Sequence, residues 1–155
     1  MMFAWIKILH VISSSVLFGT GLGTAFYMFY VNRQKNIELI ANATKQVVFV
    51  DWIFTGSSAI IQFITGIILT ALKGYSPFTP WIIISVIAYL IAGACWFPVV
   101  YLQIRCRDLA FEALKNNAPL TKKYFQYYKL WWILGIPAFI SLMIVFYLMT
   151  NRPVL

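Results

Sequence analysis

The sequence predicts an all-α protein in which four helices span a membrane as an up-down bundle. Hydrophobic residues make up 62% of the 155 residues, charged residues only 10%, and the mean hydropathy is +0.83. A soluble domain carries about a quarter charged residues, so lipid must solvate much of this surface. Four apolar segments each exceed the about 20 residues that cross a hydrocarbon core. They lie near residues 3–30, 47–72, 80–104 and 130–150.

The first apolar segment starts almost at the first residue and holds the only histidine of the chain. No basic stretch precedes it and no small-residue cleavage site follows it, so we expect a retained helix rather than a signal peptide. The polar stretch 31–46 then leads to the second segment as a short helix or a loop. We expect the whole chain, 1–155, to form one transmembrane domain.

The two later connections are marked by residues that break helices. Gly74 and the prolines around it predict a tight turn, and Pro80 suits the first position of the third helix. Apolar residues continue on one side beyond the third segment, so this helix is expected to project from the bilayer until Asn116 and Pro119 end it. The remaining connection to the fourth segment is 105–129.

The distribution of basic residues predicts the orientation. Connections 31–46 and 105–129 together carry nine Lys and Arg residues, whereas the short turn and the C-terminal tail carry only Lys73 and Arg152. The positive-inside rule places the two basic connections in the cytoplasm and both termini on the outer, periplasmic side of a bacterial inner membrane. The net charge of +8 then reflects topology rather than a nucleic-acid partner.

His10 and Lys7 lie three residues apart on one face of the first helix. A polar side chain within hydrocarbon is costly, so each needs a reason. In one interpretation the neutral imidazole of His10 is an axial ligand of haem iron, and Lys7 pairs with a propionate. In the other, His10 forms a hydrogen bond to a neighbouring helix while Lys7 reaches the interface.

Other polar or soft side chains fall at similar depths. Met143 on the fourth helix lies level with His10, where it would serve either as a second axial ligand or as a gap-filling residue. Gln62, Thr65 and Tyr89 lie near mid-membrane. They form either a polar lining or hydrogen bonds that hold the helices together.

Asp51 stands near the cytoplasmic end of the second helix, where the helix dipole favours a carboxylate. The third helix ends at the same surface with Arg105 and Arg107. We therefore expect an ion pair between Asp51 and one of these arginines that locks two helices together. The alternative role for Asp51 is a proton relay.

Ser15, Gly19 and Gly23 recur every four residues and form a stripe of small side chains on the first helix. Such a stripe allows another helix to approach closely, or leaves room for a flat cofactor.

The sequence lacks the residue sets of common enzymes. With one histidine and four acidic residues it contains no zinc-binding set, catalytic triad, P-loop or paired carboxylates. Cys95 and Cys106 are eleven positions apart on one predicted helix, too far for a disulfide within it.

Four stretches resemble a bacterial family of predicted integral membrane proteins of unknown function: KILHVISSSVLFGTGLGTAF, DWIFTGSSAIIQFITG, AGACWFPVVYLQIRCRDLA and LWWILGIPAF. The resemblance covers nearly the whole chain and implies a four-helix inner-membrane protein without an assigned activity. The opening WIKILH is also similar to the first helix of HemJ-type protoporphyrinogen oxidases. That resemblance implies that His10 matches a suspected ligand of haem b, although the further histidines of those oxidases have no counterpart here.

Two functions are therefore expected. The first is a haem-b-binding membrane protein, with His10, Lys7 and Met143 at the cofactor, that handles electrons or porphyrin. The second is a non-enzymatic subunit or assembly factor of a larger complex. A homo-oligomer is compatible with both, and four helices leave little room for a transport pathway in one chain.

Overall fold

The structure is a computed structural model and describes residues 1–152. Its helices are α1 (Met2–Arg33), α2 (Ile37–Val50), the π-helix η1 (Asp51–Gly56), α3 (Ser57–Leu72), α4 (Pro80–Lys115) and α5 (Lys122–Asn151). Because α2, η1 and α3 follow one another without a break, four stretches are long and apolar enough to span a membrane. The predicted all-α architecture with four spanning helices is confirmed.

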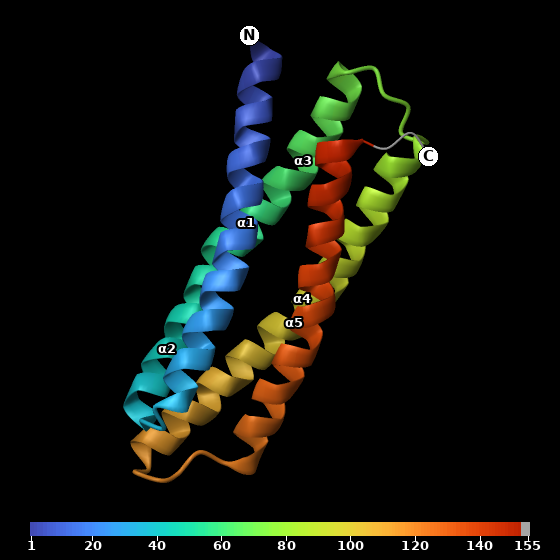
Figure 1. Ribbon diagram of the computed structural model, residues 1–155. Helices are drawn as coiled ribbons and strands as arrows, with labels where there is room; N and C mark the ends of the chain where they lie inside the picture. Colours follow the sequence, from blue (N-terminus) through green and yellow to red (C-terminus); the bar gives the residue numbers. More distant parts are fainter. Residues whose placement is uncertain (153–155) are drawn as a thin grey trace.

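The helices run up and down, so the molecule has two distinct ends (Figure 1). The N-terminus, the turn between α3 and α4, and the end of α5 lie at one end, which we call the termini end. The connections 34–36 and 116–121 lie at the opposite end, which we call the connection end. Pro80 occupies the start of α4 as expected, and Gly74 has a φ of +66° in the preceding turn.

Both predicted long connections are shorter than expected. The helix that follows α1 already begins at Ile37, where the Asn36 side chain accepts a hydrogen bond from the backbone N–H of Leu39 at 3.1 Å. Likewise α5 begins at Lys122, capped by the Thr121 hydroxyl. Polar residues of 37–46 and 122–129 are helical because each segment buries one apolar face while its basic side chains point outward.

The core is continuous near the connection end. One cluster of buried residues joins α1, α2, α4 and α5: Val31, Ile40, Ala41, Ala43, Cys106, Ala110 and Tyr124. The alanines are small enough for the helix backbones to approach closely. Tyr124 is fully buried, and its hydroxyl donates to Oδ1 of Asn32 at 2.8 Å. The buried contacts at this end therefore hold the four spanning helices together.

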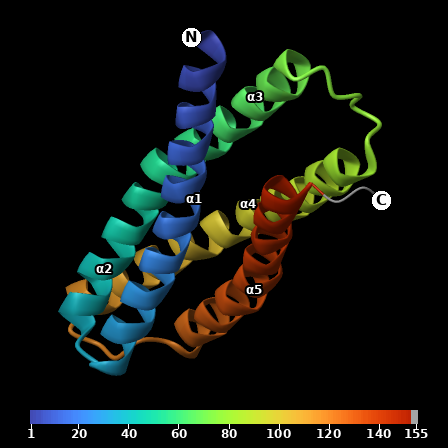
Figure 2. The same ribbon diagram turned by 45° about the horizontal axis from the view of Figure 1, so that its top comes forward.

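Toward the termini end the bundle divides into two helix pairs. α1 accompanies α3, α4 accompanies α5, and the two pairs diverge in both views (Figures 1 and 2). Side chains from both pairs enclose the space between them, and this space contains the only histidine.

Candidate functional site

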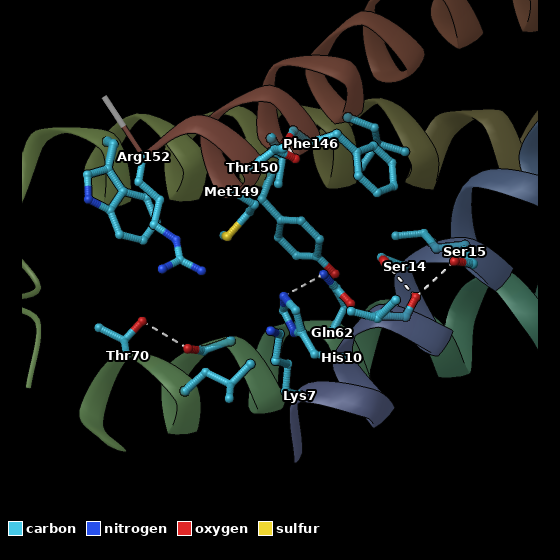
Figure 3. Close-up of a pocket in the computed structure, with 18 of the residues that line it drawn as sticks. Lys7, His10, Ser14, Ser15, Gln62, Thr70, Phe146, Met149, Thr150 and Arg152 are labelled. Atoms are coloured by element: carbon cyan, nitrogen blue, oxygen red, sulfur yellow. Dashed lines mark hydrogen bonds between the residues drawn. The ribbon is translucent and has the colours of Figure 1, made fainter. Parts of the chain in front are cut away.

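A cavity of about 470 Å³, which we call the cleft, lies between the α1–α3 pair and the α4–α5 pair near the termini end. In Figure 3, Lys7, His10 and Gln62 on one side face Met149 and Arg152 on the other. The helices supply apolar walls, which include Phe3, Leu69, Trp81, Val145 and Phe146.

His10 belongs to a directed chain of hydrogen bonds between α1 and α3. Ser13 Oγ donates to Gln62 Oε1 at 2.7 Å, and Gln62 Nε2 donates to His10 Nε2 at 2.9 Å. His10 Nδ1 lies 2.8 Å from Thr65 Oγ1, which itself donates to the carbonyl of Ile61. Since the Thr65 proton is used on that carbonyl, Nδ1 donates and Nε2 accepts, which assigns the neutral tautomer with its proton on Nδ1.

Gly66 on α3 allows the imidazole to lie against that helix. A Cβ atom at this position would stand 3.4 Å from His10 Cε1, at the limit of an ordinary contact. A side chain larger than a methyl group at position 66 would therefore press on the imidazole that bonds to Gln62 and Thr65.

With these hydrogen bonds in place, neither ring nitrogen of His10 is free to bind haem iron. Iron would bind the lone pair of a ring nitrogen, and the lone pair on Nε2 already accepts the Gln62 amide while Nδ1 carries the proton. Met143, the expected second ligand, is 47% exposed and is not among the residues that line the cleft. The methionine that does line it is Met149, about 1.7 turns further along α5.

Three basic side chains surround the cleft: Lys7 from α1, Lys73 at the end of α3 and Arg152 after α5. Arg152 Nη1 donates to the hydroxyl of Tyr75 at 3.4 Å, and Lys73 Nζ lies 4.6 Å from the ring centroid of Phe3. None of the four acidic residues of the chain lies in the described lining of the cleft. The rim of the cleft is therefore positively charged.

Aromatic contacts close the cleft toward the middle of the bundle. The Phe18 ring packs against Phe139 and Phe146, with centroids 5.0 and 5.4 Å apart. On the other side, Tyr89 donates its hydroxyl to the carbonyl of Ala59 at 2.6 Å and stacks on Phe63. The sequence indicated Tyr89 as a polar mid-membrane residue, and the structure shows it joining α4 to α3.

Asp51 forms a separate polar site nearer the connection end. It is 3% exposed, and its carboxylate accepts hydrogen bonds from Thr55 Oγ1 and from Gln103 Nε2, each at 2.8 Å. It begins the π-helix η1, a kind of segment that is frequent at functional sites.

The expected ion pair between Asp51 and Arg105 or Arg107 is not formed. Within residues 1–152, Arg107 instead pairs with Asp108 at 2.8 Å. The physical reason is helical periodicity. Arg105 lies two positions after Gln103, a rotation of about 200°, and therefore points away from Asp51. The sequence did not indicate Gln103 as the partner of Asp51. Gln103 falls at the expected end of the third span, where water can solvate a polar side chain and no protein partner is needed.

The stripe of small residues on α1 does not pack within the chain. A Cβ atom at Gly19 or Gly23 would meet no atom of another described element within 4 Å. Ser15 donates to the carbonyl of Val11 in its own helix and lines the cleft. The expected close helix contact is therefore absent from the described part of the chain.

Four apolar spanning helices define this chain as an integral membrane protein. Residues 4–153 match the family described as "Predicted integral membrane protein (DUF2269)", and the chain belongs to this family. The family resemblance noted in the sequence is thereby confirmed. Comparisons with curated proteins and with solved structures each found no match.

Proposed function

We propose that this protein binds an anionic membrane lipid in the cleft, with the head group between Lys7, Lys73 and Arg152. The observation that carries this proposal is the convergence of these three side chains on one cavity. The other nine basic residues lie between positions 33 and 129, toward the connection end. Every basic residue of the termini half therefore lines the cleft.

The predicted orientation strengthens this argument. With the nine other basic residues in the cytoplasm, Lys7, Lys73 and Arg152 lie on the outer side of a bacterial inner membrane, where basic residues are disfavoured. Three positive charges grouped on this side are then best explained by a negatively charged ligand that binds between them. Each basic residue near a membrane surface attracts anionic lipid by about 1 kcal/mol, so three around one cleft discriminate strongly between anionic and neutral head groups.

The walls favour a lipid over a small soluble anion. Phe3, Leu69, Trp81 and Val145 surround the space below the rim. A ligand with one charged end and an apolar body matches both parts, because the charge stays at the rim and hydrocarbon contacts hydrocarbon.

Native mass spectrometry of the detergent-solubilised protein tests the proposal. Phosphatidylglycerol and phosphatidylcholine with identical acyl chains are added in turn. The wild-type protein is expected to retain phosphatidylglycerol in preference, and the K7Q/K73Q/R152Q variant is expected to lose that preference. All three residues lie at the exposed rim, so the variant should fold.

The matched control removes the same charge at the other end of the molecule. K115Q/K122Q/K123Q alters three exposed basic residues that do not line the cleft. It is expected to keep the preference for phosphatidylglycerol. Equal retention by both triple variants would overturn the proposal, because lipid would then respond only to total charge.

Haem b is the second candidate, because His10 lines this cationic cleft and propionates are also anionic. When bound, haem would supply an iron centre for electron chemistry. Haem binding would require the Gln62 amide to move away from His10 Nε2, whereas lipid binding requires no such change. We therefore rank haem below an anionic lipid as the ligand. The visible spectrum tests it: a Soret band lost in His10→Ala would establish haem, and a colourless preparation despite supplied haem would exclude it. Lipid binding also suits the role of a subunit or assembly factor of a membrane complex.

A further inference from the structure

A second cavity, of about 570 Å³, adjoins the cleft between α3 and α4. We call it the side chamber. It shares residues with the cleft, among them Gly66, Thr70, Trp81, Tyr89 and Met149. His10 and Gln62 also line both spaces, so the two cavities adjoin each other rather than lying apart.

The side chamber differs from the cleft in chemistry. The walls that belong to it alone are almost entirely apolar: Phe63, Ile67 and Ala71 from α3, and Ile83, Val86 and Ile87 from α4. Lys7, Lys73 and Arg152 line the cleft but not this chamber. Positive charge is thus confined to one of the two connected spaces.

The side chamber also opens toward lipid. Ile67 is 57% exposed, and Ala71, Ile83 and Val86 are exposed as well, although all lie in spanning helices. Two aromatic pairs frame this opening. Tyr75 packs on Trp81 near the termini end, with centroids 5.5 Å apart, and Phe63 stacks on Tyr89 nearer the middle.

We propose that an acyl chain of the bound lipid passes from the cleft through the side chamber, between α3 and α4, into the bilayer. This inference rests on the proposed lipid-binding function and specifies its ligand class, a flexible acyl-chain lipid with an anionic head group. A flexible chain follows two adjoining cavities, whereas the head group stays beside the basic residues. The gap between α3 and α4 is then the lateral route by which the lipid enters the protein from the bilayer.

Photo-crosslinking in nanodiscs tests the route. Phosphatidylglycerol and phosphatidylcholine carry the same diazirine-labelled acyl chain, and adducts are located by tandem mass spectrometry. Because every lipid-facing residue is labelled to some extent, the measured quantity is a ratio. It compares adducts at Ile67, Ala71, Ile83 and Val86 with adducts at Ile64 and Leu90, which are exposed but line neither space. The ratio is expected to be severalfold higher for phosphatidylglycerol.

A blocking variant makes the test specific. Ala71→Trp fills the mouth of the side chamber from an exposed position and is expected to lower the phosphatidylglycerol ratio to the phosphatidylcholine value. Ile64→Trp, on the lipid-facing side of the same helix, is expected to leave it unchanged. Unchanged elution in size-exclusion chromatography confirms that both variants are folded.

The outcomes separate the two proposals. If phosphatidylglycerol is retained through the three basic residues but its adduct ratio equals that of phosphatidylcholine, the acyl-chain route is overturned and lipid binding in the cleft stands. If retention does not depend on those basic residues, the proposed function fails first, and the chain route fails with it.

Discussion

The side-chain amide of Gln62 on α3 donates a hydrogen bond to Nε2 of His10 on α1, with an N···N distance of 2.9 Å. This bond makes the single histidine of the chain part of the contact between two spanning helices. It also directs the ring, because Gln62 can donate only to the unprotonated nitrogen. His10 therefore borders the cleft with both nitrogens engaged, and it stabilises the pairing of α1 with α3.

Removing the Gln62 amide is expected to destabilise the protein. Gln62→Met keeps the length of the side chain but leaves His10 Nε2 without its donor and Ser13 Oγ with only the His10 carbonyl to donate to, at 3.0 Å. Hydrogen bonds between membrane helices contribute about 0.6 kcal/mol on average, so the loss of two should cost about 1 kcal/mol. The midpoint of thermal unfolding in detergent measures the change. Ser14→Ala is the control, since Ser14 bonds only to the carbonyl of Val11 in its own helix.

A larger side chain should destabilise the protein at Gly66 but not at Gly23. Gly66→Leu would drive a side chain into the imidazole of His10, because even a Cβ atom there lies at 3.4 Å. We expect a loss of about 1–3 kcal/mol in the free energy of unfolding. Gly23→Leu meets no atom of another described element within 4 Å and should change stability by less than about 0.5 kcal/mol.

The same pair of variants also tests whether the small-residue stripe joins two copies of the chain. Size-exclusion chromatography with light scattering gives the oligomeric state in detergent. If Gly23→Leu lowered the oligomeric state or the unfolding midpoint as strongly as Gly66→Leu, the stripe would be a packed surface after all.

How far the sequence predicts this molecule depends on which force decides each feature. The spans follow from hydropathy, which dominates in lipid. The cost of a polar group in lipid predicts that His10 needs a partner, and in the structure Gln62 and Thr65 are its hydrogen-bond partners. Its partner was ambiguous, because Gln62, Thr65 and Tyr89 lie at similar depths and only the helix rotations select among them.

Two features could not be read from the sequence for the same reason. The pairing of Asp51 with Gln103 rather than Arg105 depends on the rotation of α4. The convergence of Lys7, Lys73 and Arg152 depends on how two helix pairs diverge, since these residues are 66 and 79 positions apart in the chain. The rotation of a helix and the angle between helix pairs cannot be predicted from the composition of a local segment.

Asp51 is expected to tolerate asparagine but not leucine. Gln103 is 3% exposed, and its Oε1 atom has no hydrogen-bond partner among the described residues. In Asp51→Asn, a flip of the Gln103 amide lets Oε1 accept from the new side-chain NH₂, while the asparagine oxygen still accepts from Thr55. Asp51→Leu removes every acceptor and leaves two buried donors unpaired, at about 1–3 kcal/mol. Thermal unfolding compares the two variants, and an equal loss in both would show that the carboxylate itself is required.

The orientation is testable with two single cysteines. In a background with Cys95→Ala and Cys106→Ala, Asn116→Cys reports the connection end and Ser76→Cys reports the termini end; both positions are exposed. Nine basic residues toward the connection end predict that this end is cytoplasmic. In intact spheroplasts a membrane-impermeant maleimide should therefore label residue 76 at once and residue 116 only after permeabilisation. The opposite pattern would place Lys7, Lys73 and Arg152 in the cytoplasmic leaflet, and the lipid bound in the cleft would then be drawn from that leaflet.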